Sequence, residues 1–351
     1  MFKSIYPIEG FFVESKEGLF FDVKGIIHPP QFITAFVRYI PLNLLPSSIL
    51  ESRHTTVRNI RSKSYLKVYD LKERYNILSE HFPDYLKFDE SINLLLQGVP
   101  ITRLKTVFDP RQYFSLYKNT LDEAPLPLAA RKFVNALESF GIQDVGVTGS
   151  LLVNLHTASS DLDLVVYGIQ NGLKTWNVME NLFELPFLER YHSKSIQNLY
   201  NFRVKDTLMS VADFTQIEVK KRLQGIILLD NNQRTDFYIR LVKYPTEFKT
   251  TRHIITGREE ITISGVVADS TDAIFTPCRY VLKDVQINNI KNIESPIPTE
   301  ILSYRGRFCE CAFKNDHIEA RGTLEYSSDG KARLMLGSRK DHYLKLISSA
   351  S

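Results

Sequence analysis

The sequence contains little of what marks exported or membrane-bound proteins. Its 351 residues include only three cysteines, too few for a framework of several disulfides. No apolar run approaches the roughly 20 residues that a membrane helix needs. The first residues, Met-Phe-Lys-Ser, also lack the apolar core of an export signal. These absences predict a cytoplasmic protein with reduced thiols and no membrane partner.

A strong overall charge is also missing. The 44 Lys and Arg against 40 Asp and Glu leave a formal net charge of only +4. Positive charge is nevertheless concentrated in two stretches: seven basic residues face three acidic ones in 51–75, and five face one in 331–345, a net +4 in each. Such stretches are either solvated faces or surfaces that bind phosphate or nucleic acid.

The length of the chain exceeds that of one typical core, so we expect two or three domains. Composition shifts divide it into residues 1–118, 119–250 and 251–351. The overall prediction is an α+β protein. Its central domain is flanked by an N-terminal α+β domain and a C-terminal domain made of strands.

The N-terminal domain shows strand-like patterns first and helix-like patterns afterwards. Alternation and turn residues predict strands over 10–13, 19–26 and 32–39. Apolar spacing predicts helices over 67–80 and 89–96. No catalytic signature is present in this part of the chain.

The C-terminal domain is predicted to contain only short strands. They are expected over 260–268, 279–287, 301–312, 316–326 and 332–337, separated by Asp, Asn, Gly, Ser and Pro. Five short antiparallel strands in about 90 residues suggest a small closed or nearly closed β-barrel, of the OB or S1 kind.

Residues 144–168, DVGVTGSLLVNLHTASSDLDLVVYG, contain the chemical signal of the chain. A short strand turns through Gly149-Ser150 into a brief helix, and a second strand then opens with Asp161-x-Asp163. Side chains alternate along a strand, so both carboxylates lie on one face. Two carboxylates at this spacing repel each other, and hard oxygen ligands of this kind suit Mg²⁺.

The Gly149-Ser150 turn complements these acids. Backbone N–H groups at the start of a helix are unpaired and attract anions. Gly149 allows a phosphate to approach the backbone, and the Ser150 hydroxyl adds a donor. The alternative interpretations are an ordinary helix cap for the turn and a solvated edge strand for the acids.

This arrangement resembles the nucleotidyltransferase superfamily that includes DNA polymerase β. The resemblance rests on Gly149-Ser150, ten intervening residues, and Asp161-x-Asp163 before apolar residues. The wider chain resembles a group of archaeal predicted nucleotidyltransferases through the phrases Lys24-Gly-Ile-Ile-His-Pro-Pro30, Leu96-Gln-Gly-Val-Pro100 and Ile274-Phe-Thr-Pro-Cys-Arg279. It implies a mixed-sheet core with helices and two Mg²⁺ ions, for which Mn²⁺ can substitute.

The resemblance also implies a third carboxylate on a neighbouring strand. Asp236 is the candidate carried over by position, because a strand over 235–243 places it on one face with Tyr238 and Arg240. Asp213 is a rival in a helical segment, and Asp230 suits a turn. Asp236 lies 73 residues beyond Asp163, a longer spacing than in compact members of the superfamily.

Other polar residues have weaker claims to a role. Arg240 is either a nucleotide phosphate contact or a surface ion-pair partner. His156 is expected to end the short helix. A zinc site built from the cysteines and His317 lacks paired knuckles, so we expect buried cysteines instead.

The sequence therefore predicts a divalent-metal-dependent nucleotidyltransferase. Asp161, Asp163 and Asp236 are the expected metal ligands and catalytic residues. Gly149, Ser150 and Arg240 are the expected contacts to a nucleoside triphosphate such as ATP. RNA is slightly preferred as the acceptor, because a basic N-terminal face and a C-terminal barrel both suit a polynucleotide. The alternatives are a non-catalytic protein that binds nucleotides or nucleic acid, and a different acceptor hydroxyl; the oligomeric state is left open.

Overall fold

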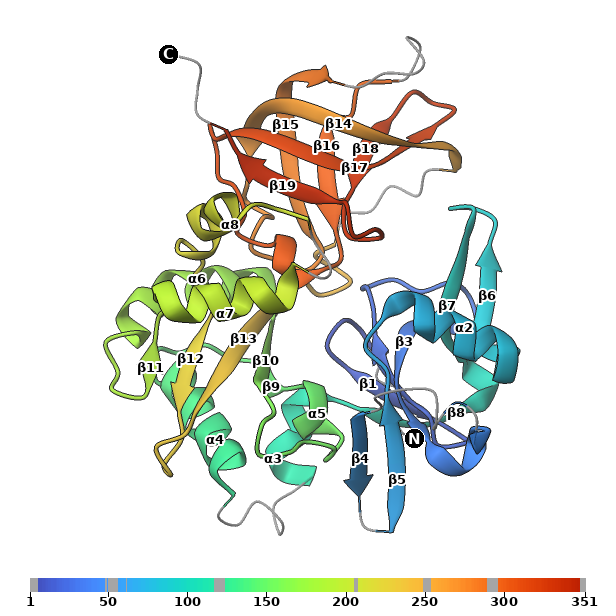
Figure 1. Cartoon of the computed structure of the whole chain (residues 1–351), viewed down its shortest axis with the longest axis vertical. Coiled ribbons are helices and arrows are strands. Elements are labelled where there is room, and N and C mark those ends of the chain that lie inside the picture. Colours follow the sequence, from blue (N-terminus) through green and yellow to red (C-terminus); the bar gives the residue numbers. More distant parts are fainter. Residues whose placement is uncertain are drawn as a thin grey trace.

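The computed structural model of the chain is a mixed α+β structure built on three β-sheets (Figure 1). It describes residues 6–47, 49, 56–60, 62–116, 124–204, 208–248, 254–288 and 296–347. The predicted α+β class is confirmed. Both predicted domain boundaries, at 118/119 and 250/251, lie outside the described residues. We therefore name the sheets N-terminal, central and C-terminal.

The N-terminal sheet has eight strands in the order β4-β5-β3-β2-β1-β8, with β7 paired to β3 and β6 paired to β7. Its long strand β3 alternates buried and half-buried residues, as the sequence pattern predicts. Helix α2 covers this sheet with the buried side chains Ile77 and Leu78. The elements are β1 Phe12–Ser15, β2 Phe20–Val23, β3 Phe32–Pro41, η1 Leu42–Leu44, β4 Thr56–Ile60, β5 Lys63–Lys67, α2 Leu71–His81, η2 Pro83–Tyr85, β6 Leu86–Asp89, β7 Leu94–Pro100, η3 Ile101–Arg103 and β8 Leu104–Phe108.

The helix predicted over 89–96 is wrong. This segment forms the β6–β7 hairpin, whose turn contains Asn93 with a φ of 46°. Strand β7 also pairs with β3, where Ile33 lies opposite Val99 and Thr34 opposite Gly98. Sheet pairing over a long sequence distance therefore outweighs the helical spacing of the apolar residues.

The central sheet has five strands in the order β11-β12-β13-β10-β9. Strand β10 lies parallel to β13 and antiparallel to β9. Helix α4 begins with Pro125 at its first turn and buries Leu126, Ala130, Phe133 and Leu137 on one face. The elements are η4 Pro110–Gln112, α3 Tyr113–Leu116, α4 Pro125–Ser139, β9 Val145–Val147, α5 Gly149–Leu152, β10 Leu162–Tyr167, α6 Ile169–Leu182, β11 Leu188–Glu189, α7 Ser193–Arg203, α8 Val211–Glu218, β12 Gln224–Leu228 and β13 Arg234–Val242.

The C-terminal sheet has six strands in the order β14-β15-β16-β18-β17-β19. Strand β14 pairs with β17 as well, so the pairings lead from β14 through β15, β16, β18 and β17 back to β14. The pair β16–β18 is parallel. The elements are β14 Ile255–Asp269, β15 Cys278–Ile287, β16 Glu300–Ser303, η5 Gly306–Phe308, β17 His317–Ser327, β18 Ala332–Met335 and β19 Tyr343–Leu346. The last strand was not predicted from the sequence.

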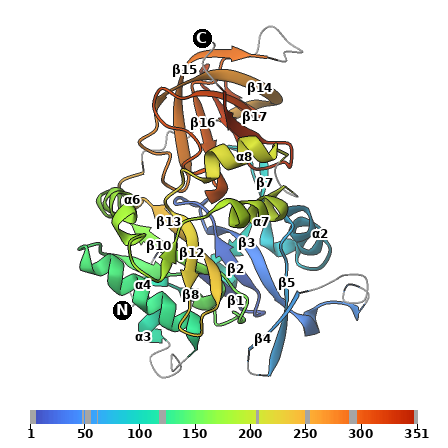
Figure 2. The ribbon, with the colours of Figure 1, turned by 60° about the vertical axis from the view of Figure 1, so that its left-hand side comes forward.

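The central sheet is covered on both faces, by different parts of the chain. Leu164 and Ile239 pack into the core that includes helix α4, whereas Val165, Tyr167 and Val242 pack into the core of the N-terminal sheet. Figure 2 shows the N-terminal strands in blue behind β10, β12 and β13. The face that bears the predicted acids is therefore the face that the N-terminal sheet covers.

The C-terminal sheet is joined to the central region through a buried acid. Glu310 is only 2% exposed. It accepts hydrogen bonds from the backbone N–H groups of Arg222 and Leu223, at 2.9 and 3.2 Å, and from Trp176 Nε1 at 2.8 Å. Three donors satisfy most of the acceptor capacity of a buried carboxylate.

In the described part of the chain, no helix is both long and apolar enough to span a bilayer.

Candidate functional site

The predicted acids meet at one end of the two central strands. The parallel register of β10 and β13 places Leu162 opposite Phe237 and Asp163 opposite Tyr238. Continued by one residue, the same register sets Asp161 opposite Asp236. Because paired residues on neighbouring strands point to the same side, all three carboxylates lie on one face. Asp236 thus lies beside the pair despite its distance in sequence.

Gly149 packs directly against one of these acids. A Cβ atom added to Gly149 would lie 2.3 Å from Asp163 Oδ2, and the glycine has a φ of +68°. Thr148 N–H donates to the Asp163 carbonyl oxygen at 2.9 Å. The carboxylate therefore occupies the space beside Gly149 that the sequence interpretation gave to a phosphate. Only glycine fits here, for both conformational and steric reasons.

The helix after this turn is shorter than expected. Helix α5 spans only Gly149–Leu152, and its residues Ser150, Leu151 and Leu152 are all buried. His156 lies beyond its end, so it does not terminate the helix as predicted. One turn of helix has little macrodipole. Any attraction of an anion at this turn must come from local N–H groups and nearby cations.

The three acids perturb one another electrostatically. Burial, and then the charge of Asp161, raise the pKa of Asp163 to about 7, while Arg240 and Arg38 oppose the rise. Burial also raises the pKa of Asp236, with a contribution from Asp161. A raised pKa means that the negative charge at this site is not fully compensated by the protein. A proton or a cation is needed to balance it near neutral pH.

Tyr191 is a site residue that the sequence interpretation missed. Its side chain is close enough to Asp236 to lower the pKa of that carboxyl. Burial, and then the charge of Asp236, raise the pKa of Tyr191 well above its usual value, so the phenol remains protonated. The residue precedes helix α7, 45 positions before Asp236 in the sequence, and no motif marks it. Tyr191 is thus a neighbour of the third carboxylate that favours its charged form.

Arg240 is not a free surface cation. Its guanidinium forms an ion pair with Glu9, whose side chain is fully buried, and it influences Asp22 and Asp163. Burial disfavours the charged guanidinium, but Glu9 and Asp22 outweigh it and raise the pKa of Arg240. Lys24 completes this group by pairing with Glu9 at 3.1 Å and with Asp22 at 2.8 Å. The residue predicted to contact a phosphate therefore links the central and N-terminal sheets.

The rival acids have other roles. Asp213 lies in the first turn of α8, where its N–H donates to Ser210 Oγ at 3.1 Å and its carboxylate accepts from the same hydroxyl at 2.7 Å. Asp230 lies in the β12–β13 turn and is 3.9 Å from Lys132. Both interactions are typical of capping and surface pairing.

A divalent cation fits the donor set of this site, although the ligands are not drawn together. Within the described ranges, no group of three or more His, Cys, Asp or Glu side chains is spaced to hold a metal ion. Asp161 and Asp236 are exposed and Asp163 is half-buried. All the donors are oxygens, which suit Mg²⁺. The cysteines are buried, as predicted.

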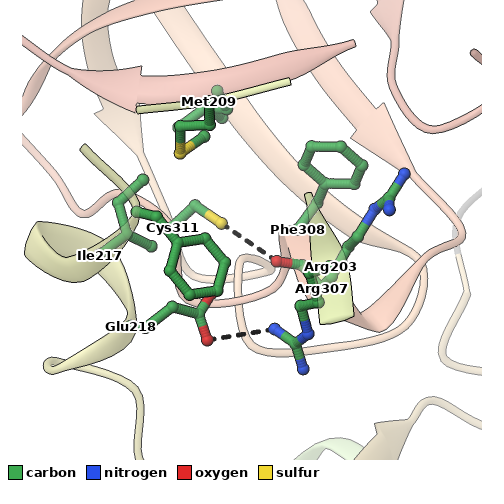
Figure 3. Close-up of a pocket in the computed structure, with 9 residues that line it drawn as sticks. Arg203, Met209, Ile217, Glu218, Arg307, Phe308 and Cys311 are labelled. Atoms are coloured by element: carbon green, nitrogen blue, oxygen red, sulfur yellow. Dashed lines mark hydrogen bonds and ion pairs between the residues drawn. The ribbon is translucent and has the colours of Figure 1, made fainter. Parts of the chain in front are cut away.

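A separate cavity, of about 30 Å³, lies between α7, α8 and the C-terminal sheet, and apolar side chains line it together with Arg203, Glu218 and Arg307 (Figure 3). Arg203 Nη1 lies 3.1 Å from Glu218 Oε2, and Lys221 Nζ lies 2.7 Å from Glu218 Oε1. The cavity holds little more than water, and Arg203 and Glu218 are already paired. We assign it no substrate.

Comparisons with known proteins leave the identity of the site open. The chain is similar to "Uncharacterized protein MJ1086" of Methanocaldococcus jannaschii, with 28% identity over 344 residues, 96% of this chain and 97% of the relative. No protein-family model matches the chain. No solved structure matches it either. The similarity to the archaeal protein extends over all three sheets rather than over the acid-bearing segment alone.

Proposed function

We propose that the protein is a divalent-metal-dependent nucleotidyltransferase, which moves a nucleoside monophosphate from an NTP to an acceptor hydroxyl. The supporting observation is the register of β10 and β13, which brings Asp236 beside Asp161 on the face that also carries Asp163. Asp161 and Asp163 alone describe an acidic strand. The third acid, 73 residues later, adds what two-metal phosphoryl transfer requires.

We also infer a polymerase-β-like core for the central sheet. Strands β9, β10 and β13 lie side by side with the Gly149 turn after the first, the Asp161-x-Asp163 pair at the second and Asp236 on the third. For the C-terminal sheet we infer an OB-like barrel. The circular order of its pairings and the parallel pair β16–β18 support this inference.

The roles of the site residues follow from their positions. Asp161, Asp163 and Asp236 would hold two Mg²⁺ ions, which when bound compensate phosphate charge and lower the pKa of the acceptor hydroxyl. The carboxylate of Asp236, whose pKa is raised, is suited to accept the proton of that hydroxyl. Tyr191 lies near this carboxylate and favours its charged form. The N–H groups of Gly149 and Ser150 are the proposed donors to the triphosphate.

An RNA acceptor fits the architecture best. A barrel of the OB kind commonly binds single-stranded nucleic acid. Four of the five basic residues of 331–345 belong to strands β18 and β19 and the segment between them, and Lys331 directly precedes β18. Positive charge on such a barrel would attract a polynucleotide backbone.

The second candidate is a protein that binds nucleotides or RNA without catalysis. The observation in its favour is that, in the part of the chain that the structure describes, the three carboxylates are not spaced as a metal-binding group. Such a protein would bind NTP or RNA yet transfer nothing.

The first test is transfer of label from a radioactive NTP to RNA with Mg²⁺ or Mn²⁺. We expect Asp161→Asn and Asp163→Asn each to reduce transfer by about 10³-fold or more, since each removes charge from the metal site. Asp230→Asn is the matched control, because it makes the same change on an exposed turn of the neighbouring hairpin. Wild-type transfer in both site variants would overturn the proposal.

A further inference from the structure

Four basic side chains of the N-terminal region form a group, with Asp22 and Asp70 as nearby acids that interact with Arg74 without a direct ion pair. The four basic residues are Arg38 on β3, Arg58 on β4, Lys67 at the end of β5 and Arg74 on α2; we call them the cationic cluster. In the described ranges none of them forms an ion pair. By contrast, the buried Lys221 pairs with Glu218, and the half-buried Arg240 pairs with Glu9.

Strand register and ring contacts bring the cluster together. Tyr39 lies opposite Lys67, and Lys67 lies opposite Thr56 of β4, two residues before Arg58. The exposed ring of Tyr69 is contacted by two cations, Lys67 Nζ at 4.5 Å and the Arg38 guanidinium at 5.5 Å from its centroid. Cation–π contacts place a charge but do not neutralise it.

Two members show that the positive charge is only partly compensated. Arg58 has a buried Nε atom with no hydrogen-bond partner. Arg74 is 6% exposed and donates only to the Val68 carbonyl oxygen, at 3.3 Å from Nε and 3.2 Å from Nη2. Burial, and then repulsion from Arg38, lower the pKa of Arg74 to about 9. A bound anion would relieve both the missing hydrogen bond and the repulsion.

The cluster adjoins the candidate site. Tyr39 and Tyr65, from the same strands, pack in one hydrophobic core with Leu151 and Leu152 of α5, directly after the Gly149-Ser150 turn. Figure 1 shows β4 and β5 beside α5. Arg38 is also close enough to Asp163 to stabilise its charged form. The cations therefore lie on the side of the acids where the Gly-Ser turn is.

We propose that the cationic cluster is a phosphate-binding site that holds the terminal phosphates of the NTP bound over Asp161 and Asp163. This inference rests on the proposed function, which requires positive charge beside the phosphates of the NTP. Helix α5 has a single turn, and Arg240 is paired with Glu9, so neither supplies free positive charge. A triphosphate carries about four negative charges, and Arg38, Arg58, Lys67 and Arg74 supply a matching number.

The N-terminal sheet then completes the site rather than only supporting it. Arginine binds phosphate oxygens through two parallel N–H donors, and Arg38 and Arg58 each retain donors for this purpose. The phosphate backbone of an RNA acceptor offers the same chemistry, so the experiment must separate the two sources.

The test is calorimetric binding of inorganic tripolyphosphate, of ATP and of a 12-nucleotide single-stranded RNA to the full chain, in EDTA and again with Mg²⁺. Arg38→Gln and Arg58→Gln are expected to weaken tripolyphosphate and ATP at least tenfold and to change RNA binding less than threefold. Lys63→Gln is the matched control: Lys63 is exposed on the same hairpin, four residues from Lys67. Arg38→Lys should restore part of the affinity, and circular dichroism verifies folding of each variant.

Each contrary result is decisive. Unchanged tripolyphosphate and ATP affinity in both arginine variants overturns the proposal, and so does a loss confined to RNA, which would assign the cluster to the acceptor. The EDTA measurement separates this inference from the enzyme proposal, because it requires neither metal nor transfer. Arginine-dependent tripolyphosphate binding in a protein without transferase activity would refute only the proposed function.

Discussion

The two faces of the central sheet differ in what they do for the protein. On one face, Leu164, Ile239 and Leu241 are fully buried beneath helices. The other face bears Asp161, Asp163 and Asp236, whose charges are only partly compensated. On this face Arg240 pairs with Glu9 of the N-terminal region, and Tyr238 lies against Gly306 of the C-terminal region. The first face stabilises the fold by burying apolar surface. The second face lowers stability because its charge is not fully neutralised, as is expected where a functional site lies.

The largest expected change in stability comes from the apolar face. Ile239→Ala should reduce the free energy of unfolding by about 4 kcal/mol, because it leaves a cavity in a fully buried position. Arg234→Ala, at the exposed start of the same strand, should change it by less than about 1 kcal/mol. Urea unfolding measures both. Equal losses would mean that the apolar face does not dominate stability.

The face of the central sheet that bears the three acids, here called the acid face, should respond in the opposite direction: a substitution there should increase stability. Asp163 has a folded-state pKa of about 7, against 3.8 as its ordinary value. The folded state therefore holds the proton more tightly, and ionisation costs stability progressively as the pH rises from about 4 through 7. Asp163→Asn removes this cost. In EDTA we expect the variant to be more stable than wild type at pH 8, on the order of 3 kcal/mol, and no more stable at pH 4.

Thermal unfolding of wild type, Asp163→Asn and Asp230→Asn at the two pH values measures this difference. The Asp230 variant controls for the loss of one negative charge at an exposed position. A stability difference between wild type and Asp163→Asn that is the same at both pH values would contradict the electrostatic description of the acid face.

A smaller effect on stability is expected at Gly149, which packs directly against Asp163. Gly149→Ala places a Cβ 2.3 Å from Asp163 Oδ2 in a residue with a φ of +68°. We expect a loss of about 2 kcal/mol in unfolding free energy together with a loss of transfer, since Asp163 must move. Gly330→Ala is the control, because its φ is +78° but no atom lies within 4 Å of the added Cβ. Similar transfer by both variants would argue against a role for the Gly149–Asp163 contact.

The local motif was predictable because its structure depends on neighbours in sequence. Alternating and apolar residues specify a strand before Thr148 and another after Asp161, and both are present as β9 and β10. The strand carrying Asp236 was likewise predictable, from its alternating face. Its place next to β10 was not, because nothing in the residues themselves encodes a parallel pairing between strands about 70 positions apart.

The remainder of the site depends on contacts over long sequence distances. Arg240 has the pattern of a strand residue with a polar face, yet its partner Glu9 precedes it by 231 residues. Tyr191 has no distinguishing neighbours. The β6–β7 hairpin was mistaken for a helix because its pairing with β3 is invisible in a short window. Three members of the cationic cluster were visible only as part of the basic stretch 51–75, and Arg38 lies outside that stretch. Residues 51–55 and 61 of the stretch lie outside the described residues.

Asp236 provides the most direct test of the central claim, that the acid face is a catalytic metal site. The measurement is transfer of label from an NTP to RNA by wild type and by Asp236→Asn, with NTP affinity measured on the same samples. The account predicts transfer by the wild type, a loss of about 10³-fold in the variant, and NTP affinity within about threefold of wild type. Undiminished transfer by Asp236→Asn, or binding without transfer by the wild type, would contradict it.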